Sequence, residues 1–257
     1  MAKIFITGSA DGLGSMAARL LISQGHEVML HARNEDRAKH ALKQNPKASH
    51  CLTGDLSILS QTKELAGKVN DAGTLDAIIY NAAIGYREPK KILTKDGLAT
   101  VFAVNSLAPY ILTALINRPG RLIYLSSSLH HQGNVRMDDL NWEKKSWSGY
   151  QAYADSKLHD LLLAFAVARK WPDVYSNGLD PGWVPTKMGG PGAPDDLRKG
   201  AETQAWLAVS EEPEAKVNGK YFFHKLIRRH NMVAADSVVQ DEFLAACAVL
   251  SGVNFQE

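Results

Sequence analysis

The chain has 257 residues, of which 45% are hydrophobic and 22% are charged, and its formal net charge is +2. This composition is typical of a soluble globular protein with room for one large α/β domain, and so small a net charge argues against nucleic acid or an anionic membrane as the main partner. The two cysteines, Cys51 and Cys247, lie far apart in apolar surroundings, so neither a disulfide framework nor a cysteine metal site is expected.

The first thirty residues read as strand, glycine-rich turn, helix and strand. An apolar run at residues 3–7 leads into the turn at residues 7–14, a helical pattern continues to Gly25, and a second apolar run spans residues 27–31. These lengths predict a βαβ unit of a parallel sheet. Gly8, Gly12 and Gly14 allow close backbone approach, and a helix amino terminus favours an anion, so the turn is predicted to hold a nucleotide phosphate.

The alternation continues to the end of the chain. Further strands are expected at residues 49–52, 75–80, 121–125, 174–179 and 220–223, separated by helices at residues 34–43, 57–70, 94–117, 153–170 and 200–210, with a closing helix at 236–250. Seven strands in this arrangement predict one α/β domain over residues 1–257, a Rossmann fold with a doubly wound, seven-stranded parallel sheet flanked by helices. A substrate-loop region is expected at about residues 183–235, and its glycine- and proline-rich segment at 189–194 is a candidate lid.

Residues 98–117 carry no charge and are long enough to cross a bilayer as a helix. The stretch nevertheless contains Thr100, Asn105 and Pro109, so we expect a helix buried in protein and no membrane partner.

Polar or special residues follow most of the predicted strands. They are Gly8, Arg33, Asp55, Asn81, Ser127 and Pro181. In a doubly wound sheet, ligands bind beyond the carboxyl ends of the strands, so these residues are expected to share one edge.

Tyr153 and Lys157 lie four residues apart at the start of a predicted helix, which places both side chains on one face. A phenol has an ordinary pKa of about 10, and a nearby ammonium lowers it toward the range of a useful acid or base. Taken alone, most such pairs are a half-buried tyrosine and a solvated lysine.

The motifs together resemble the short-chain dehydrogenase/reductase family. Those that carry the resemblance occur in family order and are Thr7-Gly8-x-x-x-Gly12-x-Gly14, Asp55, Asn81-Ala82-Ala83, Asn105, Ser127, Tyr153-x-x-x-Lys157 and Pro181-Gly182. Residues 126–131 and 138–142 further resemble the retinol-dehydrogenase-like branch, which includes many uncharacterised bacterial oxidoreductases.

The resemblance implies an NAD(P)-dependent oxidoreductase of carbonyl or alcohol substrates. Tyr153 would be the general acid/base, Ser127 would hydrogen-bond the reacting oxygen, Lys157 would lower the tyrosine pKa and hold the nicotinamide ribose, and Asn105 would hold a water. Ser128 is the alternative to Ser127. The implied cofactor-binding residues are Gly8, Ser9, Asp11, Gly12, Leu13, Gly14, Arg33, Asp55, Leu56, Asn81, Ala82, Ala83, Tyr153, Lys157, Pro181, Gly182, Val184 and Thr186. No metal is expected, and His130 and His131 are interpreted as part of a solvent-facing loop.

The preference between the two nicotinamide cofactors depends on two residues. Arg33 ends the second predicted strand, where it can pair with a 2′-phosphate, although it could also be an ordinary surface charge. Asp11 stands just before Gly12, where NADP-binding members of the family often carry a basic residue. We expect NADP(H), with NAD(H) as the alternative.

The substrate is expected to be a small, hydrophobic carbonyl or alcohol. The candidate pocket residues are Trp147, Tyr150, Trp183, Met188 and Trp206, together with the 189–194 loop. In the family, the helices that match residues 98–117 and 153–170 form a dimer interface, so we expect a homodimer or homotetramer. Because residues 1–6 are too short for a signal peptide, we expect a cytoplasmic location. Alternatives are a cofactor-binding sensor without turnover and a sugar-nucleotide epimerase or dehydratase.

Overall fold

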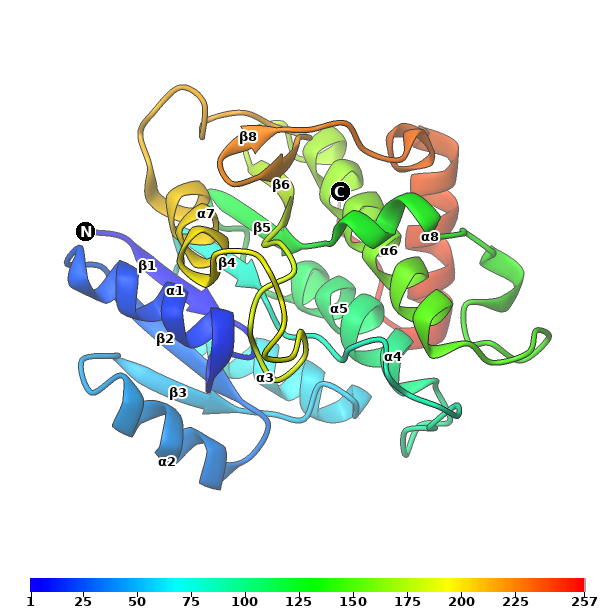
Figure 1. Cartoon of the computed structure of the whole chain (residues 1–257), viewed down its shortest axis with the longest axis horizontal. Coiled ribbons are helices and arrows are strands. Elements are labelled where there is room, and N and C mark those ends of the chain that lie inside the picture. The colour runs from blue at the N-terminus through cyan, green and yellow to red at the C-terminus, as the bar shows by residue number, and fades with distance from the viewer. Residues whose placement is uncertain (257) are drawn as a thin grey trace.

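The computed structural model describes residues 1–256, so residue 257, the last of the predicted domain, lies outside the described residues. A single eight-stranded sheet runs through the middle of the molecule (Figure 1), in the spatial order β3-β2-β1-β4-β5-β6-β7-β8. Its strands are β1 (Lys3–Ile6), β2 (Glu27–Ala32), β3 (His50–Thr53), β4 (Ala77–Tyr80), β5 (Arg121–Leu125), β6 (Tyr175–Asp180), β7 (Tyr221–Phe223) and β8 (Leu226–Ile227). The order reverses between β1 and β4, which is the position of the ligand crevice in a doubly wound sheet.

The predicted doubly wound fold is confirmed, but the prediction of seven parallel strands is wrong in one respect. The sheet has an eighth strand, and β8 pairs antiparallel with β7 through Phe223 and Leu226. The turn between them places His224 and Lys225 at φ values of 48° and 65°. Two successive residues with positive φ are typical of a tight hairpin turn, which glycine or asparagine usually provides. Because neither occurs here, the sequence carries no signal for the hairpin.

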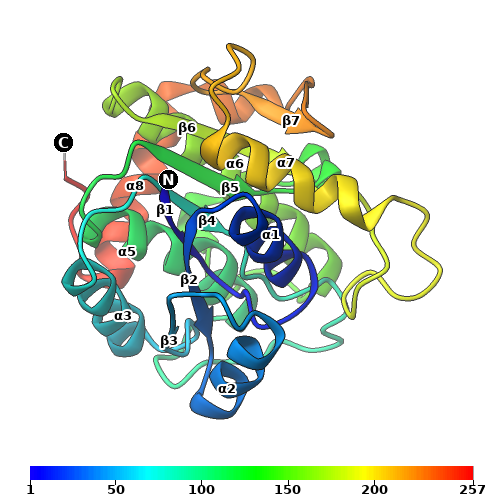
Figure 2. The same ribbon diagram turned by 90° about the vertical axis from the view of Figure 1, so that its left-hand side faces the viewer.

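Helices cover both faces of the sheet, as Figure 2 shows from the side. On one face lie α1 (Gly12–Ser23), α2 (Glu35–Gln44) and α7 (Leu197–Val209), which share a core with the sheet. On the other face lie α3 (Leu59–Asp71), α5 (Ala108–Leu115) and α6 (Gly149–Lys170), with α8 (Ser237–Ser251) packed on the outside of α6.

The stretch expected to be one helix from Thr94 is more broken than predicted. Thr94 closes a turn with Gly97, and Leu93 pairs with Ala99 in an isolated antiparallel bridge. Helical structure begins only at α4 (Thr100–Phe102), continues through a π-helical turn, η1 (Ala103–Leu107), and ends in α5. Within residues 1–256, none of the helices combines the length and the apolar character that crossing a bilayer requires.

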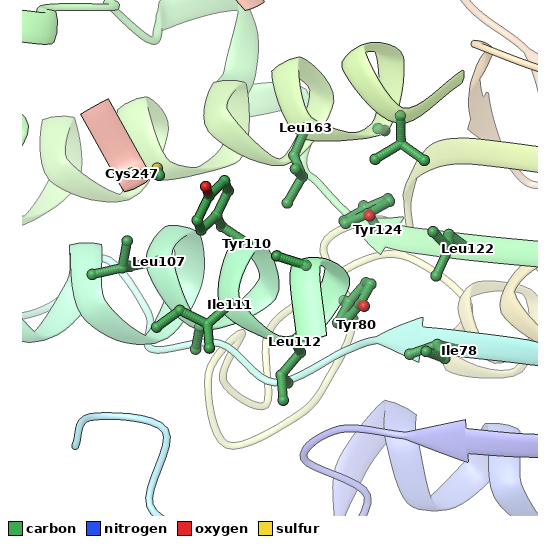
Figure 3. Packing of buried hydrophobic residues seen from close by; sticks show 14 of the residues in the cluster. Ile78, Tyr80, Leu107, Tyr110, Ile111, Leu112, Leu122, Tyr124, Leu163 and Cys247 are labelled. Carbon is green, nitrogen blue, oxygen red and sulfur yellow. The ribbon is translucent and has the colours of Figure 1, made fainter. Parts of the chain in front are cut away.

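The uncharged stretch is buried in protein, as the sequence predicts. Tyr110, Ile111 and Leu112 of α5 have no exposed surface. Figure 3 shows these side chains between Tyr80 and Tyr124 of the sheet and Cys247 of α8.

The chain covers the apolar faces of α5 and α6 with its own carboxyl-terminal segment. Phe243 of α8 stacks on the His159 ring of α6, with ring centroids 4.8 Å apart. Farther along, Tyr110 Oη donates a hydrogen bond of 2.8 Å to the carbonyl oxygen of Val253. A helix that is apolar all round is buried, and α8 accounts for this burial of α6 within one chain. The homodimer or homotetramer therefore stays a prediction without support from these faces.

Candidate active site

The glycine turn between β1 and α1 is fixed by the end of β4. Asn81 Nδ2 donates hydrogen bonds of 3.0 Å to the carbonyl oxygens of both Thr7 and Gly8. A β-carbon on Gly8 would lie 2.8 Å from Ala82 Cα, and one on Gly14 would collide with Asn81 Nδ2. Only glycine fits this close approach, which leaves the backbone at the start of α1 free to cradle an anionic phosphate. The residues present therefore fit a dinucleotide at this turn.

A buried histidine, which the sequence analysis treated only as part of a strand, joins three strand ends. His31 of β2 accepts a hydrogen bond from the Gly8 backbone nitrogen at Nδ1, 2.9 Å away, and its Nε2 lies 2.9 Å from the Gly54 carbonyl oxygen. Nε2 therefore carries the proton. Burial lowers the pKa of His31 to about 4, so the ring is neutral near pH 7.

The charged groups beside the glycine turn are largely exposed. Arg33 is exposed and makes no hydrogen bond or ion pair with any residue in the described part of the chain. Asp11 pairs with Arg37 at 3.0 Å and with Lys187 at 2.7 Å. Burial alone would raise the pKa of Asp11, but its hydrogen bonds with these two cations outweigh burial and lower it. The negative charge of Asp11 is thus already compensated.

The predicted adenine-side residues follow β3. Asp55 Oδ1 accepts hydrogen bonds from the backbone nitrogen and the hydroxyl of Ser57, at 2.9 and 2.7 Å. Leu56 is buried in the core below. Asp55 therefore shapes the loop at this edge, while its second carboxylate oxygen forms no hydrogen bond within residues 1–256.

The loop after β6 reaches back to the glycine turn. Asp180 Oδ1 accepts a hydrogen bond of 2.7 Å from the Gly182 backbone nitrogen, and Gly182 itself has a φ of 89°. Farther along this loop Val184 is buried, and the Thr186 methyl group would be 3.9 Å from a β-carbon on Gly12. This loop therefore forms one side of the crevice, with Pro181, Gly182, Val184 and Thr186, and the glycine turn forms the other side.

Tyr153 and Lys157 lie on α6 at the carboxyl end of β5. Only 8% of Tyr153 and 3% of Lys157 is exposed. Lys157 Nζ donates to the Leu125 carbonyl oxygen at 2.7 Å and to Asp160 Oδ2 at 2.8 Å, and it lies 5.5 Å from the centre of the Tyr153 ring. The lysine is therefore a buried, doubly anchored cation beside the phenol.

The three consecutive serines after β5 have different hydrogen-bond partners. Ser126 Oγ donates 2.7 Å to the Lys157 carbonyl oxygen, and the Ser128 backbone nitrogen donates 2.8 Å to Asp180 Oδ2. Ser127 Oγ accepts a hydrogen bond of 3.3 Å from the Leu129 backbone nitrogen, and of the three serines only the Ser127 side chain contributes to lowering the Tyr153 pKa. The structure thus places Ser127 rather than Ser128 beside the phenol.

Asn105 sits in the π-helical turn η1 and is buried. Its Oδ1 accepts 2.7 Å from the Ile84 backbone nitrogen, and its Nδ2 donates 3.0 Å to both the Ile84 carbonyl oxygen and Ser156 Oγ. Its side chain therefore ties the loop after β4 to α6. Single π-helical turns are frequent at functional sites, and the water-holding role of Asn105 stays a prediction.

The electrostatics around Tyr153 differ from the sequence-based expectation. Burial raises the Tyr153 pKa, Lys157 lowers it, and Asp160 and Asp180 raise it again, so that it lies above its ordinary value. Lys157 acts in the predicted direction, but burial and the two carboxylates outweigh it. Neither aspartate is among the site residues predicted from the sequence. Asp160 follows Lys157 by three residues, about one helical turn. This spacing places the two opposite charges side by side on a helix and could have indicated the ion pair.

An aromatic side chain from the loop after β4 packs against Tyr153. Tyr86, which the sequence analysis did not single out, lies edge-on to Tyr153 and Tyr150, with centroids 5.7 and 6.5 Å apart. Tyr150 and Trp183 are 42% and 54% exposed. Trp183 Nε1 donates a hydrogen bond of 2.9 Å to the Gly189 carbonyl oxygen. Met188 packs against Gly85, next to Tyr86, whereas Trp206 packs on Phe222 and Trp147 packs on Trp142.

The expectation that His130 and His131 both belong to a solvent-facing loop is wrong for His130. His131 is exposed, but His130 is fully buried, with its Nδ1 lying 2.6 Å from the Ser127 carbonyl oxygen. Residues 1–256 contain no cluster of three His, Cys, Asp or Glu side chains placed to hold a metal.

Comparison with known sequences adds independent findings. A family model described as short chain dehydrogenase matches residues 2–196. An uncharacterized oxidoreductase of Emericella nidulans is 41% identical over 258 residues, covering 99% of this chain and 98% of that protein. Human retinol dehydrogenase 13 is 30% identical over 254 residues, covering 85% of this chain and 75% of that protein.

Two solved structures share the fold. An uncharacterized protein from Mycobacterium paratuberculosis gives a TM-score of 0.83 at 24% identity, covering all of this chain and 96% of the other. A blue fluorescent protein from a metagenomic library, solved in complex with NADPH, gives a TM-score of 0.68 at 20% identity, covering 86% and 95%. At these identities the likeness is one of fold.

Proposed function

The chain belongs to the short-chain dehydrogenase family, as its motifs predict, and from this premise we propose that it transfers a hydride between a nicotinamide cofactor and a carbonyl or alcohol substrate. The resemblance to retinol dehydrogenases is likewise confirmed by the human relative. The observation that most supports the proposal is the meeting of Ser127, Tyr153 and Lys157 at the sheet edge that also carries the glycine turn.

In the proposed reaction, the residues of α6 and of the loop after β5 manage the proton and the developing charge. Reduction of a carbonyl builds negative charge on its oxygen, which needs a proton donor and a second positioned hydrogen bond. Tyr153 Oη would donate the proton and Ser127 Oγ the hydrogen bond. Lys157 would keep a positive charge beside the phenol, held there by the Leu125 carbonyl oxygen. The nicotinamide, when bound, supplies or accepts the hydride.

The arrangement around Arg33 favours NADP(H). An exposed guanidinium without an ion-pair partner in residues 1–256 is available to a 2′-phosphate. Asp11, which argued against NADP(H), is paired with Arg37 and Lys187, so its repulsion of a phosphate is reduced. A solved structure of the same fold was determined with NADPH, which agrees with this preference.

The proposed substrate is a hydrophobic carbonyl compound or alcohol. Tyr86, Tyr150 and Trp183 present partly exposed aromatic surface near the crevice. Aromatic rings with one polar end bury apolar substrate surface while leaving a hydrogen-bonding group available.

A titration with NADPH and with NADH, followed by nicotinamide fluorescence, tests the cofactor proposal. We expect NADPH to bind more tightly, and Arg33→Ala to weaken it by about 10- to 100-fold while leaving NADH nearly unchanged, because a charge-assisted hydrogen bond contributes about 1.5–3 kcal/mol. Lys39→Ala, an exposed cation on α2, is the control and should change neither affinity. Equal binding of both nucleotides, insensitive to Arg33→Ala, would refute the NADP(H) preference. Absence of binding for both would refute the proposed function.

The cytoplasmic location and the homodimer or homotetramer remain predictions. Sedimentation of the purified protein gives its mass directly, and a value near the 28.1 kDa of one chain would contradict the oligomer.

A further inference from the structure

Asp160 is a buried carboxylate at the centre of the site that the proposed mechanism does not use. Its side chain and that of Lys157 are each only 4% exposed, and Nζ and Oδ2 are 2.8 Å apart. Lys157 Nζ donates a second hydrogen bond, of 2.7 Å, to the Leu125 carbonyl oxygen. An ammonium has three donors, so these two partners fix its direction and leave one donor.

Charged and titratable groups face Tyr153 from three elements. Lys157 and Asp160 come from α6, Asp180 comes from the end of β6, and the Ser127 hydroxyl comes from the loop after β5. Tyr124 of β5 also faces Asp160, and burial raises its own pKa far above the ordinary value, so it stays neutral. The site thus holds one buried cation and two buried carboxylates, and the Lys157 charge next to the phenol is compensated.

We propose that Asp160 is a positioning residue, which holds the Lys157 ammonium against Leu125 and offsets its charge so that Tyr153 remains a protonated phenol over the neutral range. A protonated phenol is the form that donates a proton to a carbonyl oxygen during reduction. The inference rests on the proposed role of Tyr153, but its geometry stands without the cofactor.

The Asp160 carboxyl is expected to matter most above mildly acidic pH. Burial raises its pKa to about 6 despite the opposing effect of Lys157, so the carboxylate is largely ionised at neutral pH. Asp160 in turn keeps the pKa of Lys157 above its ordinary value although burial acts to lower it. Removing the carboxylate while keeping a hydrogen-bond acceptor therefore isolates its charge.

The test is the titration of Tyr153 itself, in wild type and in Asp160→Asn. Asparagine Oδ1 can still accept from Lys157. With fluorotyrosine in place of tyrosine, fluorine NMR resolves single residues, Tyr153→Phe assigns the resonance, and the lower intrinsic pKa of the label keeps the titration within the stable range of the fold. Asp155→Asn is the matched control, because Asp155 is also buried on α6 but pairs with Lys145, away from the phenol.

We expect Asp160→Asn to lower the Tyr153 pKa by about one pH unit, the effect of removing one nearby buried negative charge, and Asp155→Asn to leave it unchanged. An unchanged or raised Tyr153 pKa in Asp160→Asn would overturn the inference. Should Asp160→Asn not fold, Asp160→Ser provides the same loss of charge with less bulk, and the same two outcomes decide. Failure of NADPH to bind wild type would sink the proposed function while leaving this titration intact, so the two ideas fail separately.

Discussion

The two halves of the crevice differ in the interactions that hold them together. Around the glycine turn, the ends of β1, β2 and β4 are joined by neutral hydrogen bonds between backbone atoms and the side chains of Asn81, which donates, and His31, which accepts from Gly8. The charged side chains lie outside. Around Tyr153, the ends of β5 and β6 meet α6 through the buried charges of Lys157, Asp160 and Asp180. The hydrogen bonds of the first half, around the glycine turn, fix the shape of the backbone. The buried charges of the second half, around Tyr153, set the protonation of the phenol.

This difference determines what each half tolerates. A backbone cradle depends on contacts at the van der Waals limit and on neutral hydrogen bonds, so it fails when an atom is added or when one of these hydrogen bonds is lost. A buried charge cluster depends on the balance between desolvation and pairing, so a substitution of equal volume changes its chemistry. Predictions for the two halves should therefore differ in kind.

The largest expected effect comes from adding one methyl group to the first half. In Gly14→Ala, the β-carbon would collide with Asn81 Nδ2 and lie 2.8 Å from the Gly8 carbonyl oxygen. We expect NADPH affinity to fall by at least about 1,000-fold, or about 4 kcal/mol, as measured by fluorescence titration. Gly67→Ala is the control, since no atom lies within 4 Å of its β-carbon on α3, and alanine there should stabilise the helix by about 0.5–1 kcal/mol. Unaltered NADPH binding in Gly14→Ala would contradict a cradle that depends on close backbone approach.

Acid should weaken the first half through His31. Because burial lowers its pKa from 6.5 to about 4, its contribution to the free energy of unfolding is present above pH 6.5 and is lost as the pH falls toward 4. The loss at pH 4 is about 3 kcal/mol. His31→Gln removes the titrating ring, so urea unfolding at pH 7 and pH 4 should show about that much less acid destabilisation than in wild type. His40→Gln, at an exposed position, should behave as wild type; equal acid sensitivity in all three proteins would contradict a neutral, hydrogen-bonded His31.

The first half was predictable from sequence because its determinants are local. The spacing of Gly8, Gly12 and Gly14 between a strand and a helix specifies the turn, and Asn81 follows the next strand of the crevice. The alternation of apolar strands with amphipathic helices likewise specifies the doubly wound sheet. Only the hydrogen bonds of the buried His31 ring were not predicted, because the position of a histidine within a strand does not indicate which atoms its ring will contact.

The second half was predictable in its residues but not in its electrostatics. The sequence indicated Ser127, Tyr153 and Lys157, yet the net effect on the phenol depends on Asp180 from another strand and on how deeply α6 is buried. Burial of α6 depends in turn on α8, far along the chain. The π-helical turn at Asn105 escaped for a similar reason, since tertiary packing decides it.

The most direct test of the proposed reaction compares wild type with Tyr153→Phe, following the loss of NADPH absorbance with isatin and a broad panel of aromatic aldehydes and ketones. We expect wild type to consume NADPH, and the variant to lose about 100- to 10,000-fold in kcat/KM while NADPH affinity is retained, because only the proton donor is removed. Turnover by Tyr153→Phe at the wild-type rate would contradict Tyr153 as the acid. A wild type that binds NADPH but reduces no member of the panel would favour a cofactor-binding sensor instead.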